Sequence, residues 1–409
     1  MGGCGMSIYT VPPQLPELKP QIRAHFLSMT RRPDIDSANL HATDQADVLG
    51  ARLLTELRRE GTFNLETLLV LNDSYGALAS AAALLKTGQI YSFQDRLSQQ
   101  RAALQNLTST HHTNKFTQLS MQQLRCPDAQ LQRELAGVEL VLLKLPRAQE
   151  ELGWLAWAAA RLCPDATLVA VGLQKYMTVS QNEVLRRYFG HVSASRGFGK
   201  ARALVAAQPI ADAPEPWQHK SHDVAALPGG ALELSGGAAT FGAERLDPSS
   251  RLLIKAMAEE FQPTSDGHIV DLGCGNGTLA VSFALLHPTL SVTAVDQSAS
   301  AVISTLRSAE LSDVSQQVSA ARMDALEEFA DGSVAHVVLN PPFHSGHAVD
   351  TQIATKLFRA AARALCPGGT LWCVWNSGLK YRPELETLIG PTRQVARNAK
   401  FTVTVSQRR

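Results

Sequence analysis

Two short stretches in the second half of the chain combine residue types that could carry out chemistry. Residues 271–277 read DLGCGNG, in which an acid precedes three glycines at alternating positions. Residues 340–343 read NPPF, in which an amide, two prolines and an aromatic ring follow an apolar run. Glycines let a ligand approach the backbone closely, and an amide oxygen accepts hydrogen bonds from an amine. Together the stretches indicate a cofactor site beside a site that handles an amine.

The stretch DLGCGNG has the setting of a cofactor-binding loop. It follows a buried strand predicted at 268–272 and precedes a helix predicted to begin at Thr278. The GxGxG spacing differs from the GxGxxG of dinucleotide sites, and the acid favours a cationic ligand over a pyrophosphate. S-adenosylmethionine, with its sulfonium and ammonium groups, fits this description. The loop residues assigned to the cofactor are Asp271, Gly273, Cys274, Gly275 and Gly277.

Two further acids follow the next predicted strands. Asp296 ends a strand predicted at 290–296, and an acid there accepts hydrogen bonds from ribose hydroxyls. Asp324 follows a strand predicted near 317–323, where it can meet the adenine amine. Acids at three successive strand ends strengthen the prediction of S-adenosylmethionine as the cofactor.

The stretch NPPF stands where the reaction would take place. Asn340 ends a strand predicted at 336–340, and ligands gather at the carboxyl ends of parallel strands. The exocyclic amine of a base is a poor nucleophile, because its lone pair is delocalised into the ring. The side chain of Asn340 and the carbonyl of Pro341 could hold its two N–H groups and direct the lone pair at the methyl donor. Pro341 and Pro342 fix the loop, and Phe343 could stack on a flipped base. We predict these four residues as the catalytic set, with Asn340 also facing the cofactor.

The spacing HxxH of His344 and His347 invites a metal site. A third ligand is not found nearby in the sequence, so we predict no metal. Contacts to nucleic acid and ordinary surface histidines both stay open for this pair.

Strand–helix alternation runs through both halves and predicts a parallel α/β sheet in each. The stretch 70–79, VLNDSYGALA, stands where IVDLGCGNGTLA stands at 269–280. In the same order, ELVLLKLPR at 139–147 stands where HVVLNPPF stands at 336–343. This indicates an internal duplication. The first copy has one glycine in place of three and lacks the amide, so we predict that only the second copy binds the cofactor.

Composition excludes several classes of protein. Hydrophobic residues make up 45% of the 409 residues and the formal net charge is +1, which predicts a globular chain without a global basic excess. None of the six cysteines forms a CxxC pair, which suits a reducing cytoplasm. We predict no secretory signal, no membrane span and a monomer.

Several motifs resemble those of the bacterial ribosomal RNA guanine-N2 methyltransferases: DLGCGNG, VDQS, NPPFH with HSGHA, and NAKFTVTV. LLVLNDSYGALAS, HSGHA and NAKF are closer to the large-subunit enzyme than to its small-subunit relative. The resemblance covers roughly residues 45–409. It implies a duplicated Rossmann-like methyltransferase whose C-terminal copy binds S-adenosylmethionine and whose N-terminal copy positions RNA. The segment 241–247, FGAERLD, departs from the family pattern at Ala243 and Arg245.

We therefore expect four segments. They are an N-terminal extension at 1–45, a degenerate methyltransferase-like domain for RNA binding at 46–207, a linker at 208–240, and a catalytic domain at 241–409. The basic stretch 186–202 is an RNA-contact candidate, with a solvated helix end and hairpin as its alternative.

The expected reaction is methyl transfer from S-adenosylmethionine to the N2 amine of a guanine in ribosomal RNA, with 23S RNA preferred over 16S RNA. DNA adenine-N6 and protein glutamine-N5 methyltransferases also use NPPF and stay open as alternatives. A non-enzymatic RNA-binding assembly factor is the alternative outside the enzymes.

Overall fold

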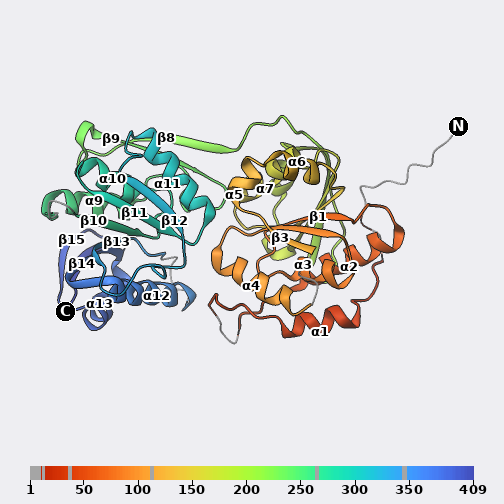
Figure 1. The fold of residues 1–409 in the computed structure, drawn as a ribbon, viewed down its shortest axis with the longest axis horizontal. Coiled ribbons are helices and arrows are strands. Elements are labelled where there is room, and N and C mark those ends of the chain that lie inside the picture. Colours follow the sequence, from red (N-terminus) through yellow and green to blue (C-terminus); the bar gives the residue numbers. More distant parts are fainter. Residues whose placement is uncertain (1–10, 12–13, 36–38, 111–114, 263–266, 343–347) are drawn as a thin grey trace. The chain divides into compact units, whose positions relative to one another are not determined.

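Two units make up the chain, Met1–Pro216 and Trp217–Arg409 (Figure 1). Each has its own sheet and its own hydrophobic core. The computed structural model describes residues 11, 14–35, 39–110, 115–262, 267–342 and 348–409.

The N-terminal unit is built on a single sheet with helices packed on it (Figure 1). Its strands are β1 (Thr67–Leu71), β2 (Gln89–Phe93), β3 (Phe116–Gln118), β4 (Leu140–Lys144), β5 (Thr167–Leu173), β6 (Phe189–Ala194) and β7 (Ala201–Pro209). Its helices are α1 (Pro20–Ser28), α2 (Gln45–Glu60), α3 (Ala77–Leu84), α4 (Leu97–Thr108), α5 (Met121–Arg125), α6 (Ala129–Ala136), α7 (Gln149–Leu162) and α8 (Val179–Arg186), with a 3₁₀ turn η2 (Gln174–Tyr176).

The C-terminal unit repeats this plan and adds a hairpin. Its strands are β8 (Trp217–Asp223), β9 (Ala231–Gly237), β10 (His268–Leu272), β11 (Ser291–Asp296), β12 (Val318–Arg322), β13 (Val334–Leu339), β14 (Leu365–Asn376), β15 (Thr392–Arg397) and β16 (Phe401–Gln407). Its helices are α9 (Pro248–Glu260), α10 (Thr278–Leu286), α11 (Ala299–Leu311), α12 (Ala348–Ala364) and α13 (Arg382–Leu388), with 3₁₀ turns η3 (Pro228–Gly230) and η4 (Ser377–Leu379).

The two sheets have the same topology. Their strand orders are β3-β2-β1-β4-β5-β7-β6 and β12-β11-β10-β13-β14-β16-β15. Five strands of each are parallel, while the last two run antiparallel to their neighbours. The registers also correspond, because Leu71 pairs with Leu143 as Leu272 pairs with Leu339. The tandem α/β fold predicted from the sequence is confirmed, although each sheet is mixed and not purely parallel.

The segment predicted as a linker, 208–240, contains structure. Strands β8 and β9 pair antiparallel, and the side chains of Leu232 and Leu234 are fully buried in the core of the C-terminal unit. The Ser235 N–H donates to Ser308 Oγ of α11 at 2.8 Å, which fixes the hairpin on that helix. The second unit therefore begins at Trp217, earlier than the predicted 241. The alternating leucines mark a strand, but the surrounding Gly and Pro obscured it.

The segment predicted as an extension, 1–45, also contributes to a core. Ile22 and Phe26 of α1 are buried with residues of α2 and α3. Helix α2 begins with a capping box, in which the Asp44 carboxylate accepts from the N–H of Asp47 and the Asp47 carboxylate accepts from that of Asp44. Such caps satisfy N–H groups that have no partner inside the helix.

The central strands of the C-terminal sheet are covered on both faces. Helices α9, α10 and α11 pack with the hairpin on one face, and α12 and α13 pack on the other. Four of the five residues of β10 are buried, which is usual for a parallel strand between two helical layers. A fully buried leucine contributes about 2 kcal/mol, so these layers hold the strand ends in fixed positions.

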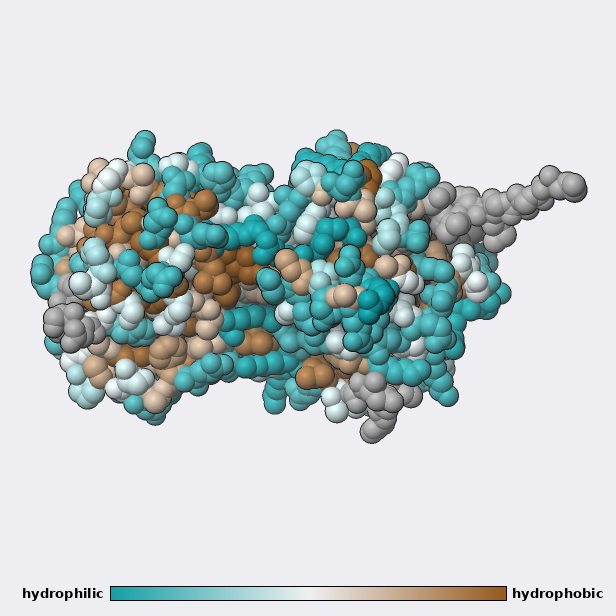
Figure 2. Space-filling model, turned by 45° about the horizontal axis from the view of Figure 1, so that its top comes forward, coloured by the Kyte–Doolittle hydropathy of each residue, from teal (hydrophilic) through white to brown (hydrophobic). Residues whose placement is uncertain are grey.

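The surface is mixed in character. On the face shown in Figure 2, hydrophobic area is more extensive on the C-terminal unit than on the N-terminal one. Phe241 of the C-terminal unit and Val179 and Leu27 of the N-terminal unit are among the large apolar residues that are exposed. Within the described ranges, no helix combines the length and apolar character that crossing a membrane requires.

Two glycines at equivalent positions of the two units allow a test of whether both copies pack in the same way at this point. Gly76 and Gly277 each precede the helix after the first central strand, with φ of 84° and 83°. A Cβ at either would lie 2.9 Å from a backbone Cα of the next helix, that of Ala103 or Thr305.

We expect Gly76→Ala and Gly277→Ala each to lower the free energy of unfolding by roughly 2 kcal/mol or more in denaturant titrations. Gly61→Ala is the control, because its φ is also positive but the space around it is open. A decrease no larger than that of the control would contradict the packing role.

Candidate active site

The carboxyl ends of three neighbouring strands form the site. Strand β10 pairs in parallel with β11 on one side and with β13 on the other. Adjacent strands lie about 4.8 Å apart, so side chains at their ends share one edge of the sheet. Asp271 near the end of β10, Asp296 at the end of β11 and Asn340 after β13 therefore gather there, as predicted.

The glycine loop between β10 and α10 leaves room in front of its backbone. Gly273 and Gly275 have φ of 82° and 55°, and a Cβ on either would meet no atom within 4 Å. Cys274 is buried, and its N–H and that of Gly273 donate to the carbonyl of Val295 in β11. Gly277 instead packs against α11. The loop thus presents an open, positive-φ backbone to a ligand, which side chains at these positions would obstruct.

Asp271 is fully buried beneath this loop. Its Oδ2 accepts from the N–H of Ala280 at 3.0 Å, while its Oδ1 is buried without a partner among the described residues. Burial, followed by the charge of Asp296, raises the pKa of Asp271 to about 7. An unpartnered carboxylate oxygen is unfavourable in isolation, and a cationic ligand would satisfy it.

Asp296 links its strand to the glycine loop. Its Oδ2 accepts from the N–H of Gly275 at 3.2 Å, and its Oδ1 accepts from that of Ser298 at 2.9 Å. A carboxylate at a strand end is an acceptor of the kind that ribose hydroxyls bind. The geometry suits the predicted contact to a ribose.

Asp324 lies at the same edge but is already engaged. It follows β12, and both of its oxygens accept from the Nζ of Lys356 in α12 at 2.6 Å. The backbone there is tied to β11, because the N–H of Met323 donates to the Asp296 carbonyl. The adenine contact assigned to Asp324 stays a prediction, and this ion pair would have to share the carboxylate with the ligand.

The first turn of α9 orients Asn340. The Asn340 Nδ2 donates to Ser250 Oγ at 2.9 Å, which turns the amide nitrogen toward the helix. Ser249 Oγ lies 3.2 Å from Asn340 Oδ1 but only 2.6 Å from the carboxylate of Asp247, the cap of α9. A hydroxyl has one proton, and the carboxylate is the closer and stronger acceptor. The Asn340 Oδ1 therefore retains capacity to accept from an amine.

The rest of the NPPF stretch is partly described. Pro341 is buried and Pro342 is half-buried after the strand, so both fix the chain beside Asn340. The predicted stacking residue Phe343 lies outside the described residues, as do His344 and His347. Within the described ranges, no cluster of three or more His, Cys, Asp or Glu side chains is arranged to hold a metal ion.

Sequence reasoning missed Asn276, which lies inside the glycine loop. Its Nδ2 donates to the carbonyls of Ala243 and Arg245 at 2.9 Å each, and its Oδ1 accepts from Thr278. The segment 241–247 is thereby held over the loop even though it departs from the family pattern. A buried amide among glycines was the available signal. Ser249 and Ser250 were also missed, because their partner Asn340 is far away in sequence.

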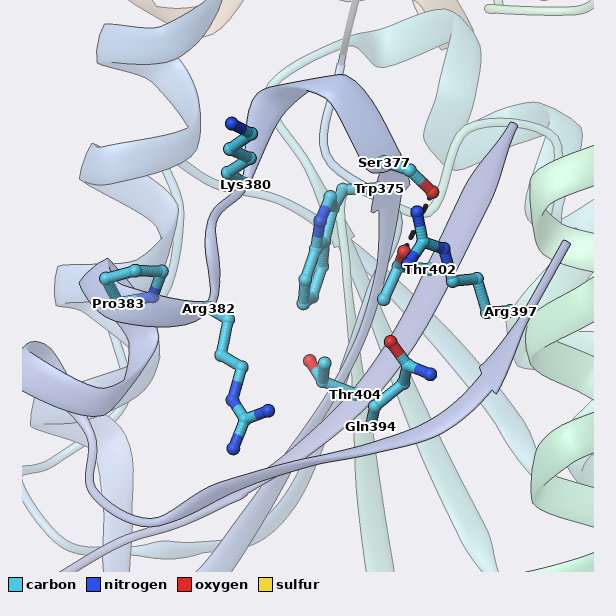
Figure 3. Close-up of a pocket in the computed structure, with 9 residues that line it drawn as sticks. All are labelled: Trp375, Ser377, Lys380, Arg382, Pro383, Gln394, Arg397, Thr402 and Thr404. Atoms are coloured by element: carbon cyan, nitrogen blue, oxygen red, sulfur yellow. Dashed lines mark hydrogen bonds between the residues drawn. The ribbon is translucent and has the colours of Figure 1, made fainter. Parts of the chain in front are cut away.

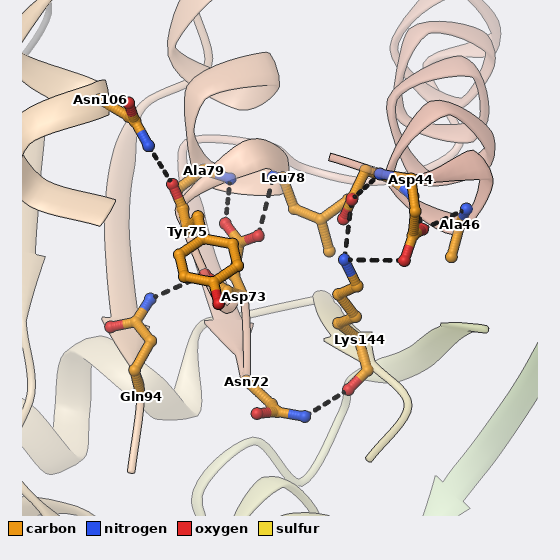
Figure 4. A network of polar contacts seen from close by, with 11 residues as sticks. Asp44, Ala46, Asn72, Asp73, Tyr75, Leu78, Ala79, Gln94, Asn106 and Lys144 are labelled. Atoms are coloured by element: carbon orange, nitrogen blue, oxygen red, sulfur yellow. Dashed lines mark hydrogen bonds and ion pairs between the residues drawn. The ribbon is translucent and has the colours of Figure 1, made fainter. Parts of the chain in front are cut away.

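At the equivalent strand ends, polar side chains of the N-terminal unit bond to one another and to its own backbone (Figure 4). Asp73 is fully buried, and its two oxygens accept from the N–H groups of Leu78 and Ala79. Gln94 follows β2 as Asp296 ends β11, and it donates to the Asp73 carbonyl at 3.3 Å. This arrangement supports the prediction that the first copy does not bind the cofactor.

At the end of β4 stands a lysine in the position that Asn340 has in the other unit. The Lys144 Nζ lies 2.7 Å from the carboxylate of Asp47 and 3.4 Å from that of Asp44, at the start of α2 (Figure 4). Lys144 and Asp47 are both largely buried, and the two carboxylates raise the pKa of the lysine. The N-terminal edge is thus closed by a buried ion pair.

The basic stretch 186–202 spans the end of α8, strand β6 and the start of β7. Its five basic residues, Arg186, Arg187, Arg196, Lys200 and Arg202, are all exposed. Arg202 Nε donates to the Ser195 carbonyl, and the Arg196 guanidinium lies over the ring of Phe198. The role of the stretch in RNA contact stays a prediction.

Comparison with known proteins agrees with this geometry. The model of the family described as "Methyltransferase small domain" matches residues 231–405, and that of the "RLMG N-terminal domain" matches 18–210. The protein named "Ribosomal RNA large subunit methyltransferase G" from Pseudomonas paraeruginosa is 33% identical over 386 residues, 92% of this chain and 96% of its own. The chain belongs to the large-subunit ribosomal RNA methyltransferase G family.

A second methyltransferase G protein, from Pseudomonas fluorescens, is 33% identical over 388 residues, 92% of this chain and 96% of its own. A solved structure, the "T. Thermophilus 16S rRNA N2 G1207 methyltransferase (RsmC) in complex with AdoMet and Guanosine", has a TM-score of 0.65 at 23% identity. It covers 84% of this chain and 88% of that chain, and it shows that the two share a fold. The predicted resemblance is confirmed, and the chain is a methyltransferase.

The residues at the edge of the C-terminal sheet fit the cofactor of such an enzyme. An open positive-φ loop would admit S-adenosylmethionine, the unpartnered Asp271 oxygen would receive its ammonium group, and Asp296 would receive its ribose. These residues make the second copy the candidate cofactor site of this chain.

Ser250 should act by positioning Asn340. Ser250→Ala removes the acceptor of the Asn340 N–H, so we expect kcat to fall about tenfold with the cofactor dissociation constant unchanged. Ser250→Thr keeps the hydroxyl and should restore most of the rate. The matched control is Ser282→Ala, because Ser282 is buried with a hydroxyl that has no partner among the described residues. An unaltered kcat in Ser250→Ala would rule out the positioning role.

Cofactor affinity should depend on pH through Asp271. Burial raises the pKa of Asp271 to about 7, so its contribution to the stability of the free protein is present below its ordinary pKa and lost as pH rises through 7. A cationic ligand prefers the ionised form, so calorimetry should show affinity falling several-fold as pH drops from about 8 to about 6. Asp271→Asn should bind more weakly at the higher pH and lose this dependence. If the affinities of the wild-type protein and of Asp271→Asn changed equally with pH, the assigned role of Asp271 would be refuted.

Proposed function

We propose that this chain transfers a methyl group from S-adenosylmethionine to the exocyclic N2 amine of a guanine in 23S ribosomal RNA. The observation that supports it most is the oriented Asn340, whose amide nitrogen is held by Ser250 while its oxygen keeps capacity to accept. The relatives named as large-subunit methyltransferases favour 23S RNA over 16S RNA.

The residues of the site would act by orientation and electrostatics. When bound, S-adenosylmethionine supplies an electrophilic methyl group. Asn340 Oδ1 accepts one N–H of the guanine amine, and the Pro341 carbonyl accepts the other, which aligns the nitrogen lone pair toward the cofactor. As the nitrogen forms its bond to the methyl carbon, it becomes tetrahedral and positively charged, so both acceptors bind its N–H groups more strongly, and this lowers the barrier. The methyl–sulfur electron pair stays on the departing thioether, and the methylated amine then loses one N–H proton to solvent. The buried Asp271 and the loop backbone hold the donor in line.

The N-terminal unit would contribute RNA binding. Asp73, Gln94 and Lys144 stand at its strand ends and are engaged in contacts within the unit, so its described residues favour a role other than chemistry. Exposed Arg186 and Arg187 are available to phosphate groups. Because ribosomal RNA is its substrate, we place the enzyme in the cytoplasm, and we expect a monomer.

The function is tested by mapping guanine-N2 methylation in 23S RNA from cells with and without the chain. One modified guanine should disappear on deletion and return when the purified enzyme and cofactor are added. The return of a 16S modification instead, or of label in protein or DNA, would overturn the assignment.

Replacement of the orienting amide gives a sharper test of its role. Asn340→Ala should keep the cofactor dissociation constant but lower kcat on the order of 100-fold, because it removes a hydrogen bond that strengthens in the transition state. Calorimetry and single-turnover methylation measure the two quantities. A loss of cofactor binding with unchanged turnover of bound enzyme would assign Asn340 to the cofactor instead.

A further inference from the structure

A basic pocket in the C-terminal unit is lined by residues of β14, β15, β16 and the start of α13 and by two residues of the turn after β14 (Figure 3). Its volume is ≈ 260 Å³, and it combines cationic, hydroxyl and amide side chains around an indole ring. It is lined by Trp375, Ser377, Lys380, Arg382, Pro383, Gln394, Arg397, Thr402 and Thr404.

The pocket shares the sheet edge of Asn340. Strand β14 pairs in parallel with β13, where Cys373 lies opposite Leu339, so the end of β14 reaches the same carboxyl edge. Strand β16 pairs with β14 on its other side and places Thr402 opposite Trp375. At about 4.8 Å per strand, Thr402 on β16 lies roughly 10 Å from Asn340 across the sheet, and Arg397 on β15 lies roughly 14 Å from it.

Three cations surround the pocket on different sides of the Trp375 ring (Figure 3). Arg382 is paired with Glu386 at 2.9 Å. Lys380 and Arg397 are exposed, and neither has an ion-pair partner in the part of the chain that the structure describes. Their charges can act on an incoming anion without first breaking an ion pair.

A buried hydroxyl in the pocket lacks a partner. Thr404 is fully buried, and its Oγ1 makes no hydrogen bond to any described residue. The neighbouring hydroxyls of Ser377 and Thr402 are bonded to each other at 2.8 Å. Buried polar atoms are normally satisfied, so the Thr404 hydroxyl indicates a missing acceptor or a water that bridges to one.

We propose that this pocket binds the phosphate backbone of the RNA strand beside the target guanine. The proposal rests on the proposed function and adds a substrate contact to it. The cations are spread around the opening, which suits a chain of phosphates better than one small anion. Trp375 is 2% exposed, so its ring offers no face for stacking a base. Contacts here therefore set the position of the strand, while the base is selected at Asn340.

The test is a double variant, Lys380→Gln with Arg397→Gln, assayed on deproteinised 23S RNA. We expect the KM for RNA to rise on the order of tenfold, with kcat at saturating RNA and the cofactor dissociation constant unchanged. The dependence of log KM on log salt should also flatten, by about 0.7 for each phosphate that the variant no longer neutralises. Thr404→Val should raise KM less and leave the salt dependence intact.

Lys255→Gln is the matched control. Lys255 is an exposed cation on α9, which packs on the other face of the same sheet, and its substitution should leave the KM unchanged. If wild-type enzyme methylates the RNA and the double variant shows the same KM and salt dependence, the pocket proposal is overturned while the function stands. If wild-type enzyme transfers no methyl group to this RNA, the proposed function itself fails. Circular dichroism melts of the double variant, of Thr404→Val and of Lys255→Gln check that all three are folded.

Discussion

Both units depend on a polar contact between the first turn of a helix and the residue that ends the fourth parallel strand. In the N-terminal unit this contact is the ion pair between Lys144 and Asp47, and in the C-terminal unit it joins Asn340 to Ser250. Removing one partner of a buried ion pair leaves an uncompensated charge and costs about 3–5 kcal/mol. The pair of Lys144 and Asp47 therefore stabilises the N-terminal unit, and its charges are not available to a substrate. The contact of Asn340 with Ser250 is neutral and uses only the amide nitrogen, so the amide oxygen can accept a hydrogen bond from a substrate.

The two buried carboxylates differ in the same way. Both reach the N–H of the alanine three residues after the helix-starting glycine, and burial raises the pKa of each, of Asp73 to about 6 and of Asp271 to about 7. Asp73 has a hydrogen bond on each oxygen, whereas Asp271 has one oxygen without a partner among the described residues. In the first copy both carboxylate oxygens are thus satisfied by the protein itself. In the second copy one oxygen can still bind a cationic ligand.

The sequence predicted the tandem fold and the strand ends that carry the site because glycine spacing and acid placement are local signals. At the sheet edges, the alternation FTVTVS indicates the final strand β16, and a hairpin was one of the two alternatives at 186–202. Strand β15 and the β8–β9 hairpin were missed, since their short alternations are interrupted by Gly, Pro and charged residues. Partners were missed for another reason. Ser250 precedes Asn340 by 90 positions, and Lys356 follows Asp324 by 32, so only the folded chain brings them together.

The nearly neutral net charge of the chain explains why the positions of individual cations and of Asn340 matter for binding RNA. With a formal net charge of +1, the chain gains little long-range attraction for RNA, and several of its cations are held in ion pairs. In the C-terminal unit, Arg363 pairs with Asp331 and Arg393 with Glu260. In our proposal, Lys380 and Arg397, which have no ion-pair partner among the described residues, bind the RNA strand weakly but favour one register of it. Selection of the base is left to an amide whose orientation is fixed before the substrate arrives, which is where a methyltransferase gains most from rigidity.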